Sequence, residues 1–349
     1  MSNQSVKHLA LEILAALIAL VAVTVSVTPR GSAYAEGVSA PHAPRDLTPR
    51  QYLPILMRAP VGSWSLAGSM NTERYDHAAI LLATGQVLVA GGFNDQSGWL
   101  ASAELYDPAS NTWASTGSMS AMRRWFTATL LHSGKALVAG GDGSDDGGIT
   151  YTTLAGAELY DPTNDSWSPA GEMSTGRRFH TATLLQSGKV LVTGGIYQPT
   201  PGYEPIYCLA TTELYDPTSN SWSSAGNMST CRLGQTATLL PSGKVLVAGG
   251  CGMEVCLATA ELYDPASNMW SPAASMSAVR TAHTATLLPS GKVLVAGGDN
   301  LINQSYDVLS SAELYDPVTN TTTTHVDVTM ISKKVAEPPR RSGYEPNRV

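Results

Sequence analysis

Two columns of side chains that could bind a ligand recur along this 349-residue chain. The first column is made of arginines, and the second lies three residues further on and is mostly histidine. The arginines are Arg74, Arg123, Arg177, Arg232 and Arg280. The histidines are His77, His180 and His283, with Phe126 and Gln235 at the two remaining positions. Because a guanidinium group matches a carboxylate in a bidentate way, the columns predict an anion site if they converge on one surface.

The same repetition also favours a purely structural interpretation of both columns. A framework residue recurs in every repeat, and an arginine in that role pairs with a carboxylate or with backbone carbonyls. Three imidazoles that converge on an axis would in addition suit copper or zinc. We expect the framework role and keep the ligand site as the alternative. No metal or other cofactor is expected.

A repeat of about fifty residues carries the two columns. In each copy an apolar stretch ends in a glycine pair, and the motif ELYDP follows. The pairs are Gly91-Gly92, Gly140-Gly141, Gly194-Gly195, Gly249-Gly250 and Gly297-Gly298. The tyrosines of the motif are Tyr106, Tyr160, Tyr215, Tyr263 and Tyr315, and the tryptophans that follow are Trp113, Trp167, Trp222 and Trp270. A period of this length with β-type content predicts propeller blades rather than a helical solenoid.

Each copy divides into four strands by its residue types. Stretches such as ATLL alternate small polar and apolar residues, which suits an innermost strand with little room near an axis. A Ser-Gly-Lys turn leads into a continuously apolar strand such as KVLVAGG, as expected where neighbouring blades cover both faces. AELYD forms the third strand, an Asp-Pro turn follows, and the tryptophan strand is the outer edge.

These motifs resemble the kelch repeat, and the resemblance implies an all-β, kelch-type β-propeller over residues 61–328. Counting strands predicts five four-stranded blades. Residues 64–70 would then complete the last blade and tie the ring shut, because Thr322 stands where its tryptophan is expected. In the alternative, residues 321–328 form that outer strand themselves. Residues 64–70 are then left to a sixth blade that is absent or incomplete, as in a six-bladed or truncated propeller.

The two ends of the chain differ from the repeats. Residues 1–35 combine an apolar run with Ala33-Tyr34-Ala35, which predicts a signal peptide cleaved before Glu36. The alternative is an uncleaved membrane anchor, since the run is nearly long enough to span a bilayer. We expect a Pro-rich linker over 36–60 and a disordered, charged tail over 329–349. The predicted location is therefore secreted, or on the cell surface or envelope.

All four cysteines lie in the middle of the chain, at Cys208, Cys231, Cys251 and Cys256. In an exported chain an even, clustered set predicts two disulfides. Of the three possible pairings, proximity in sequence favours Cys251 with Cys256 and Cys208 with Cys231. A four-cysteine zinc site is the alternative, but the spacing lacks paired Cys-x₂-Cys knuckles.

Composition limits the classes of partner. The formal net charge is −7, so the summed field of the protein repels a phosphate backbone, and nucleic acid is not an expected partner. We expect a monomeric, non-catalytic binding module for an extracellular protein or carbohydrate. Its ligand would lie on the upper face, over loops that differ between repeats while the strands do not. These loops are residues 93–102, 142–156, 196–211, 251–259 and 299–311.

The enzymatic alternative comes from the resemblance to galactose oxidase, a copper enzyme with a kelch-type propeller. In that family two histidines and two tyrosines hold copper, one tyrosine is cross-linked to a cysteine, and a further domain supplies a ligand. Here Tyr75 near His77 is the closest match, and no cysteine occurs in the first two repeats. A copper radical oxidase or another carbohydrate-active enzyme is therefore the second hypothesis, because a fold does not define a function.

Overall fold

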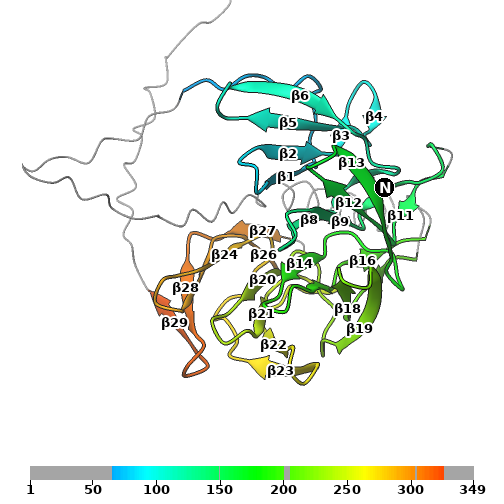
Figure 1. Cartoon of the computed structure of the whole chain (residues 1–349). Helices are drawn as coiled ribbons and strands as arrows, with labels where there is room; N and C mark the ends of the chain where they lie inside the picture. The colour runs from blue at the N-terminus through cyan, green and yellow to red at the C-terminus, as the bar shows by residue number, and fades with distance from the viewer. Residues whose placement is uncertain (1–64, 149, 200–204, 303–304, 326–349) are drawn as a thin grey trace, which may run out of the picture.

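The computed structural model describes residues 65–148, 150–199, 205–302 and 305–325. Within these ranges the protein is all-β and contains no helix. Five four-stranded antiparallel sheets fan around a common axis, each built from one repeat (Figure 1). We number these blades one to five in chain order. No helix of the described residues is long and apolar enough to cross a membrane.

Each blade takes its four strands consecutively, from the axis outward, with a small hairpin inserted between the second and third strands of most blades. Blade one consists of β1 (Ala78–Leu81), β2 (Val87–Ala90), β5 (Ala103–Asp107) and β6 (Thr112–Thr116). Blade two consists of β8 (Thr127–Leu130), β9 (Ala136–Ala139), β12 (Gly156–Asp161) and β13 (Ser166–Glu172). Blade three consists of β14 (Thr181–Leu184), β15 (Val190–Thr193), β18 (Thr211–Asp216) and β19 (Ser221–Asn227). Blade four consists of β20 (Thr236–Leu239), β21 (Val245–Ala248), β22 (Ala260–Asp264) and β23 (Met269–Ala273). Blade five consists of β24 (Thr284–Leu287), β25 (Val293–Ala296), β28 (Ala312–Asp316) and β29 (Thr321–His325).

Short strands decorate one face of the fan, which we call the upper face. It lies at the ends of the second strands, where the glycine pairs stand. These strands are β3 (Phe93–Asn94), β4 (Gly98–Trp99), β7 (Met122–Arg124), β10 (Asp142–Ser144), β11 (Thr152–Thr153), β16 (Ile196–Tyr197), β17 (Tyr207–Cys208), β26 (Asp299–Ile302) and β27 (Ser305–Val308). Apart from β7, which lies in the link between blades one and two, they belong to the loops that vary between repeats, so the upper face differs from blade to blade while the sheets do not.

Neighbouring blades pack through two complementary apolar faces. Leu88 and Ala90 lie on one face of blade one, and they share a cluster with Val138 and Tyr160 of blade two. We call these the leucine face and the valine face. The same pairing recurs between later blades, with Leu137 and Val192 in one cluster, Leu191 and Val247 in the next, and Leu246 and Val295 in the last. The continuously apolar second strand is thus buried on both sides, as its sequence predicts.

The repeated tyrosine and tryptophan connect blades at their outer edges. Each tyrosine hydroxyl lies 2.7 to 3.1 Å from the side-chain oxygen of an asparagine or aspartate in the following turn. The indole N–H of Trp167 donates to the carbonyl of Gly117 at 2.7 Å, at the end of the preceding outer strand. Trp222 and Trp270 make the equivalent bonds to the carbonyls of Ala170 and Ala225. Both aromatic columns are therefore structural.

The last blade is completed differently from our prediction. The described part of the 64–70 segment, residues 65–70, does not close it, because β29 holds the outer position and pairs with β28. Thr321 to Thr324 are β-branched and favour a strand even without the tryptophan. Residue 65 onward instead lies against blade one, where the carbonyl of Gly68 accepts the indole N–H of Trp113 at 2.7 Å. This is the bond that the preceding outer strand makes in the later blades.

The five blades form an open series. The inner strands follow one another in order, β1 beside β8, β8 beside β14, β14 beside β20 and β20 beside β24. Blade five does not pack in this way on blade one among the described residues, and Figure 1 shows their ribbons apart. In consequence Leu294 on the leucine face of blade five and Val87 on the valine face of blade one are only half-buried. The predicted signal peptide, linker and tail lie outside the described residues.

Candidate functional site

The five column arginines lie inside the blades rather than on the upper surface. Arg177 is fully buried, and its guanidinium donates to the Glu213 carboxylate at 2.7 Å and to the carbonyls of Gly194 and Thr211. The other four repeat this arrangement, with ion pairs of 2.8 to 3.0 Å. These pairs are Arg74–Glu104, Arg123–Glu158, Arg232–Glu261 and Arg280–Glu313.

The glutamate of each pair also fixes the connector, the segment that leads from one outer strand to the next inner strand. In blade three the amide of Ser174 donates to the second oxygen of Glu213 at 2.7 Å. Ser120 and Ser229 make the same contact with the glutamates of blades two and four. Two buried charges thus satisfy each other and three segments of backbone, which is what a buried ion pair requires to persist. The geometry is that of a framework, and the guanidinium faces no open surface.

The second column lines a cavity of about 340 Å³ on the axis, formed by the upper ends of all five inner strands. His180 and His283 are buried in its wall, and their Nε2 atoms lie 3.0 Å from the hydroxyls of Thr127 and Thr236. Burial, with the nearby Arg177 charge, lowers the pKa of His180 to about 3. Burial and Arg280 lower the pKa of His283 to about 4. Burial and the charge of Arg74 also lower the pKa of His77. All three imidazoles are therefore neutral at pH 7.

Between the two columns stands a residue that the sequence reasoning did not single out. Asp76, Trp125, Phe179 and Ala282 each follow a column arginine by two positions and adopt φ values of 53° to 56°. Gly234 occupies this place in blade four with φ 65°. The left-handed region costs an L-residue about 1–2 kcal/mol, and a bulky side chain is rare there. We call this set the left-handed ring.

Backbone hydrogen bonds run around the left-handed ring at the mouth of the axial cavity. The amide of Trp125 donates to the carbonyl of Asp76 at 3.4 Å. In the same way Gly234 donates to Phe179, and Ala282 donates to Gly234. Residues in strained backbone conformations concentrate at ligand sites, where the surrounding structure holds them. The signal in the sequence is a variable position between two repeated columns.

Two arginines pack on the aromatic members of this ring. The guanidinium carbon of Arg124 lies 3.7 Å from the ring centre of Trp125 and 4.4 Å from that of Trp99. Arg178 stands 5.3 Å from Phe179, and its guanidinium is bonded to Asp142 and Gln198. The ring centres of Trp125 and Phe179 are 4.8 Å apart. We name the set formed by blades one to three the mouth cluster; it comprises Tyr75, Asp76, Phe93, Trp99, Arg124, Trp125, Arg178 and Phe179.

Of the carboxylates at the mouth, Asp76 is half-buried and Asp142 is fully buried. Burial raises the pKa of Asp76, and the Arg124 guanidinium, 3.9 Å from its carboxylate, opposes that rise. Burial likewise raises the pKa of Asp142 against the charge of Arg178. Aromatic faces, guanidinium donors and carboxylate acceptors therefore lie together at the entrance of one cavity. Such a mixture of apolar and polar groups is typical of a small-molecule site.

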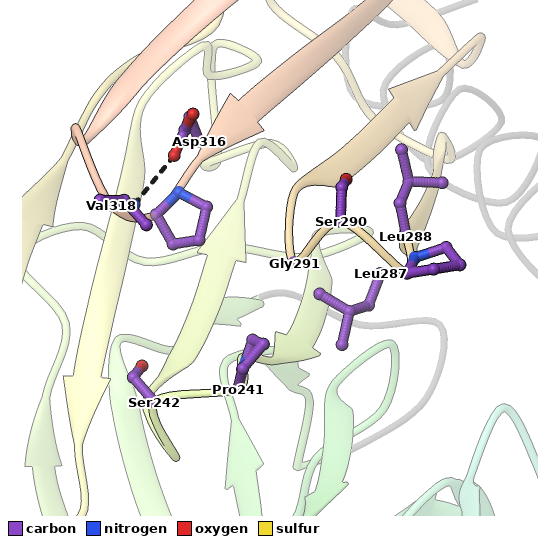
Figure 2. A pocket seen from close by; sticks show the side chains of 10 residues that line it. Pro241, Ser242, Leu287, Leu288, Ser290, Gly291, Asp316 and Val318 are labelled. Carbon is purple, nitrogen blue, oxygen red and sulfur yellow. Dashed lines mark hydrogen bonds between the residues drawn. The ribbon is translucent and has the colours of Figure 1, made fainter.

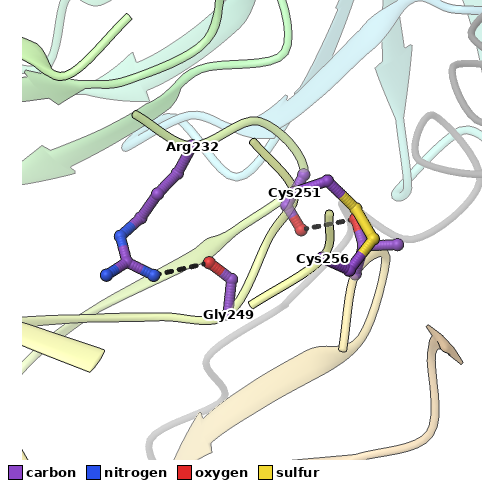
Figure 3. The surroundings of a disulfide bond; sticks show 6 residues. Arg232, Gly249, Cys251 and Cys256 are labelled. Atoms are coloured by element: carbon purple, nitrogen blue, oxygen red, sulfur yellow. Dashed lines mark hydrogen bonds between the residues drawn. A yellow bond between two sulfur atoms is a disulfide. The ribbon is translucent and has the colours of Figure 1, made fainter. Parts of the chain in front are cut away.

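The cysteines form the two pairs that proximity favours. Cys208 is bonded to Cys231 with a Cα separation of 5.5 Å, and Cys251 is bonded to Cys256. Figure 3 shows the second pair close to Arg232, which donates to the carbonyl of Gly249. Both bonds therefore fix upper loops beside the mouth. Disulfides of this kind indicate an oxidising compartment.

A second cavity, of about 630 Å³, lies between the hairpin turns of blades four and five (Figure 2). Its lining is mostly apolar, with Pro241, Leu287, Pro289 and Val318 among the residues. Neither column reaches it, and it lies at the opposite end of the inner strands from the mouth cluster. Among the described residues no group of three or more His, Cys, Asp or Glu side chains is arranged to hold a metal ion.

Comparison with known proteins agrees with this fold. Residues 74–120 and 235–277 match the family model described as the Kelch motif. The solved structure described as "Structure of YjhT" is similar, with a TM-score of 0.56 and 17% sequence identity. The alignment covers 72% of this chain and 84% of that chain. No curated protein matches the chain.

The class that these findings define is the kelch-type β-propeller. Two stretches of this chain match the Kelch motif, and the whole described region has that fold. At 17% identity the likeness to the solved structure shows the fold alone.

The buried ion pairs predict a large loss of stability when one partner is removed. Arg177→Ala leaves Glu213 buried and unpaired, and we expect it to lower the free energy of unfolding by about 3–5 kcal/mol. Urea denaturation measures the change. The control is Lys189→Ala in the same blade, which removes a half-exposed ion pair with Asp216 and should cost under about 1 kcal/mol. Equal stability of the two variants would contradict the framework role.

The buried histidines predict a loss of stability in acid. Between pH 6.5 and about 4 the unfolded chain protonates His180 and His283 while the folded chain does not, so stability falls as pH falls. Replacing both by Gln, the residue that blade four has naturally, should flatten the dependence by up to about 1.4 kcal/mol per pH unit for each histidine. Chemical denaturation across this range tests it, with His132→Gln on the surface as the control. An unchanged slope in the double variant would refute the assignment.

Proposed function

We propose that the protein is a non-catalytic binding module whose ligand lies over the mouth cluster, at the entrance of the axial cavity. The observation that carries the proposal is the left-handed backbone of Trp125 and Phe179, two bulky residues where blades four and five have Gly234 and Ala282. The fold does not need a large side chain there, because two of its blades lack one. The left-handed backbone itself recurs in all five blades, so what sets blades one to three apart is the large side chains that they place at the mouth.

The chemistry of the mouth cluster supports a carbohydrate ligand. A sugar ring offers an apolar face and a rim of hydroxyls, and the cluster offers partly exposed rings at Trp99 and Trp125 beside polar groups. The side chains of Arg124 and Asp76 can supply a donor and an acceptor at the same place. A cavity of about 340 Å³ is of the size that small ligands occupy. A protein segment that presents similar groups is the other partner class.

The two disulfides support a place outside the cytosol. Together with the export signal expected over residues 1–35, they lead us to propose a secreted or cell-surface protein that acts as a monomer. The upper loops fixed by the disulfides would then face an extracellular ligand.

The copper oxidase hypothesis does not fit the residues present. All four cysteines are engaged in disulfides, so none remains to cross-link a tyrosine. Among the described residues no group of three or more His, Cys, Asp or Glu side chains is arranged to hold a metal ion, and this includes His77, His180 and His283. We therefore derive no step through copper.

The proposal predicts that ligand binding and stability respond differently at the left-handed ring. In Trp125→Gly we expect binding to fall at least tenfold while thermal stability changes little, because the relief of left-handed strain offsets the lost packing of a half-buried side chain. Phe179→Gly should also lower binding, but it should lower stability as well, because Phe179 is 6% exposed and packs in an apolar cluster with Ile196 and Leu233. A glycan array probed with the full chain identifies the carbohydrate, and titration calorimetry with that carbohydrate measures the affinity.

The matched control is Ala282→Gly, the same kind of change at the same backbone position in blade five, where affinity should stay as in the unchanged protein. Equal affinity of all three variants would remove the mouth cluster from the site. An array without any binding would instead reject carbohydrate as the ligand class.

A further inference from the structure

Blade five carries an apolar face that no described residue covers. Its leucine face consists of Leu288, Leu294 and Ala296, all half-buried. The equivalent residues of blade three, Leu185 and Leu191, are at most 2% exposed. Leu288 also lines the apolar cavity in Figure 2, so the uncovered surface continues around the lower edge of the blade.

A buried carboxylate with no side-chain partner among the described residues stands at the upper edge of the same blade. Asp299 is 6% exposed, and burial raises the pKa of its carboxyl group. Among the described residues nothing forms an ion pair or a side-chain hydrogen bond with it. Asp142 holds the equivalent position in blade two, two residues after the first glycine of the pair, and there Arg178 neutralises it.

In the earlier blades the connector covers these positions. In blade two the connector begins after the outer-strand residue Trp167, and its Met173 packs against Gly140. A Cβ atom placed on Gly140 would lie 3.2 Å from the Met173 side chain. Five residues after this methionine, Arg178 reaches Asp142. The tryptophan and the column arginine are ten residues apart in every repeat that has both. The connector therefore has a constant register.

The same register can be continued beyond blade five. Thr322 pairs with Tyr315 as Trp167 pairs with Tyr160, so it marks the tryptophan position. Counting onward, the methionine position falls on Val328 and the position of Arg178 falls on Lys333. The apolar Val328 therefore occupies the sequence position that would cover the glycine pair, and the cationic Lys333 occupies the position that would neutralise Asp299.

We propose that residues 326–334 bind across the leucine face of blade five, with Val328 against Gly297 and Lys333 paired with Asp299. The chain leaves β29 on this blade, and eight residues from His325 to Lys333 reach about 26 Å when extended, enough to cross a four-stranded sheet. Charge favours the contact, since the tail is basic and the protein as a whole is acidic. The expectation of a disordered tail then applies only beyond this segment.

A charge swap in the full chain tests the ion pair. We expect Lys333→Glu and Asp299→Lys each to lower the melting temperature by about 2–4 °C, and the double variant Asp299→Lys with Lys333→Glu to recover it. Lys334→Glu is the control, because the register assigns Lys333, and not its neighbour Lys334, to the position that pairs with Asp299. A melting temperature that Lys333→Glu and Lys334→Glu change equally, or a double variant without recovery, would overturn the proposal.

Limited trypsin digestion tests the apolar contact without depending on the charges. In the unchanged chain we expect cleavage after Arg340 and Arg341 to be at least tenfold faster than after Lys333 and Lys334. Val328→Asp should abolish that difference. Equal rates in the unchanged chain would reject the docked segment. A dimer by light scattering, with cleavage unaffected by Val328→Asp, would assign the face to a second copy instead.

Discussion

The buried arginine–glutamate pair is the interaction on which every blade depends. A charge inside a sheet is tolerated when it is paired and hydrogen-bonded, and each guanidinium here meets a carboxylate and two backbone carbonyls. Because the same glutamate also accepts a hydrogen bond from a connector amide, the pair fixes the position of the connector between two blades. The left-handed residue comes two positions after the arginine, and the cavity histidine comes one position after that. Scaffold and mouth are therefore positioned by one contact.

This arrangement separates the residues that build the protein from those that can recognise a ligand. The repeated residues, from the glycine pairs to the aromatic columns, bond within a blade or to the adjacent one. The residues that differ between repeats gather at the upper face, where Trp125, Phe179 and Arg124 surround the axial entrance. Blades four and five are small at the same positions, so the mouth is asymmetric. An asymmetric site on a symmetric scaffold suits one ligand rather than a ring of equal contacts.

Much of the scaffold could be predicted from the sequence, because each type of periodic residue favours one structural role. The all-β blades, their strand order and the pairing of Cys251 with Cys256 follow from turn residues, apolar runs and proximity. For the arginine column the sequence favours the framework role but keeps a ligand ring as the alternative, since both predict the same repetition. Residues 64–70 were assigned to the wrong blade because the missing tryptophan at Thr322 was given more weight than the β-branched run around it. The left-handed ring could not be predicted, because the φ angles of its residues are set by backbone hydrogen bonds between blades and not by the residue types.

Arginine-selective chemical modification of the folded chain, located by mass spectrometry, tests the division between scaffold and mouth most directly. If the column arginines are internal, Arg74, Arg123, Arg177, Arg232 and Arg280 will resist a dicarbonyl reagent until the protein unfolds, and will then react together. Modification of even one of them in the folded protein, at the rate found after denaturation, would contradict the account, because that arginine would then face solvent and be open to a ligand.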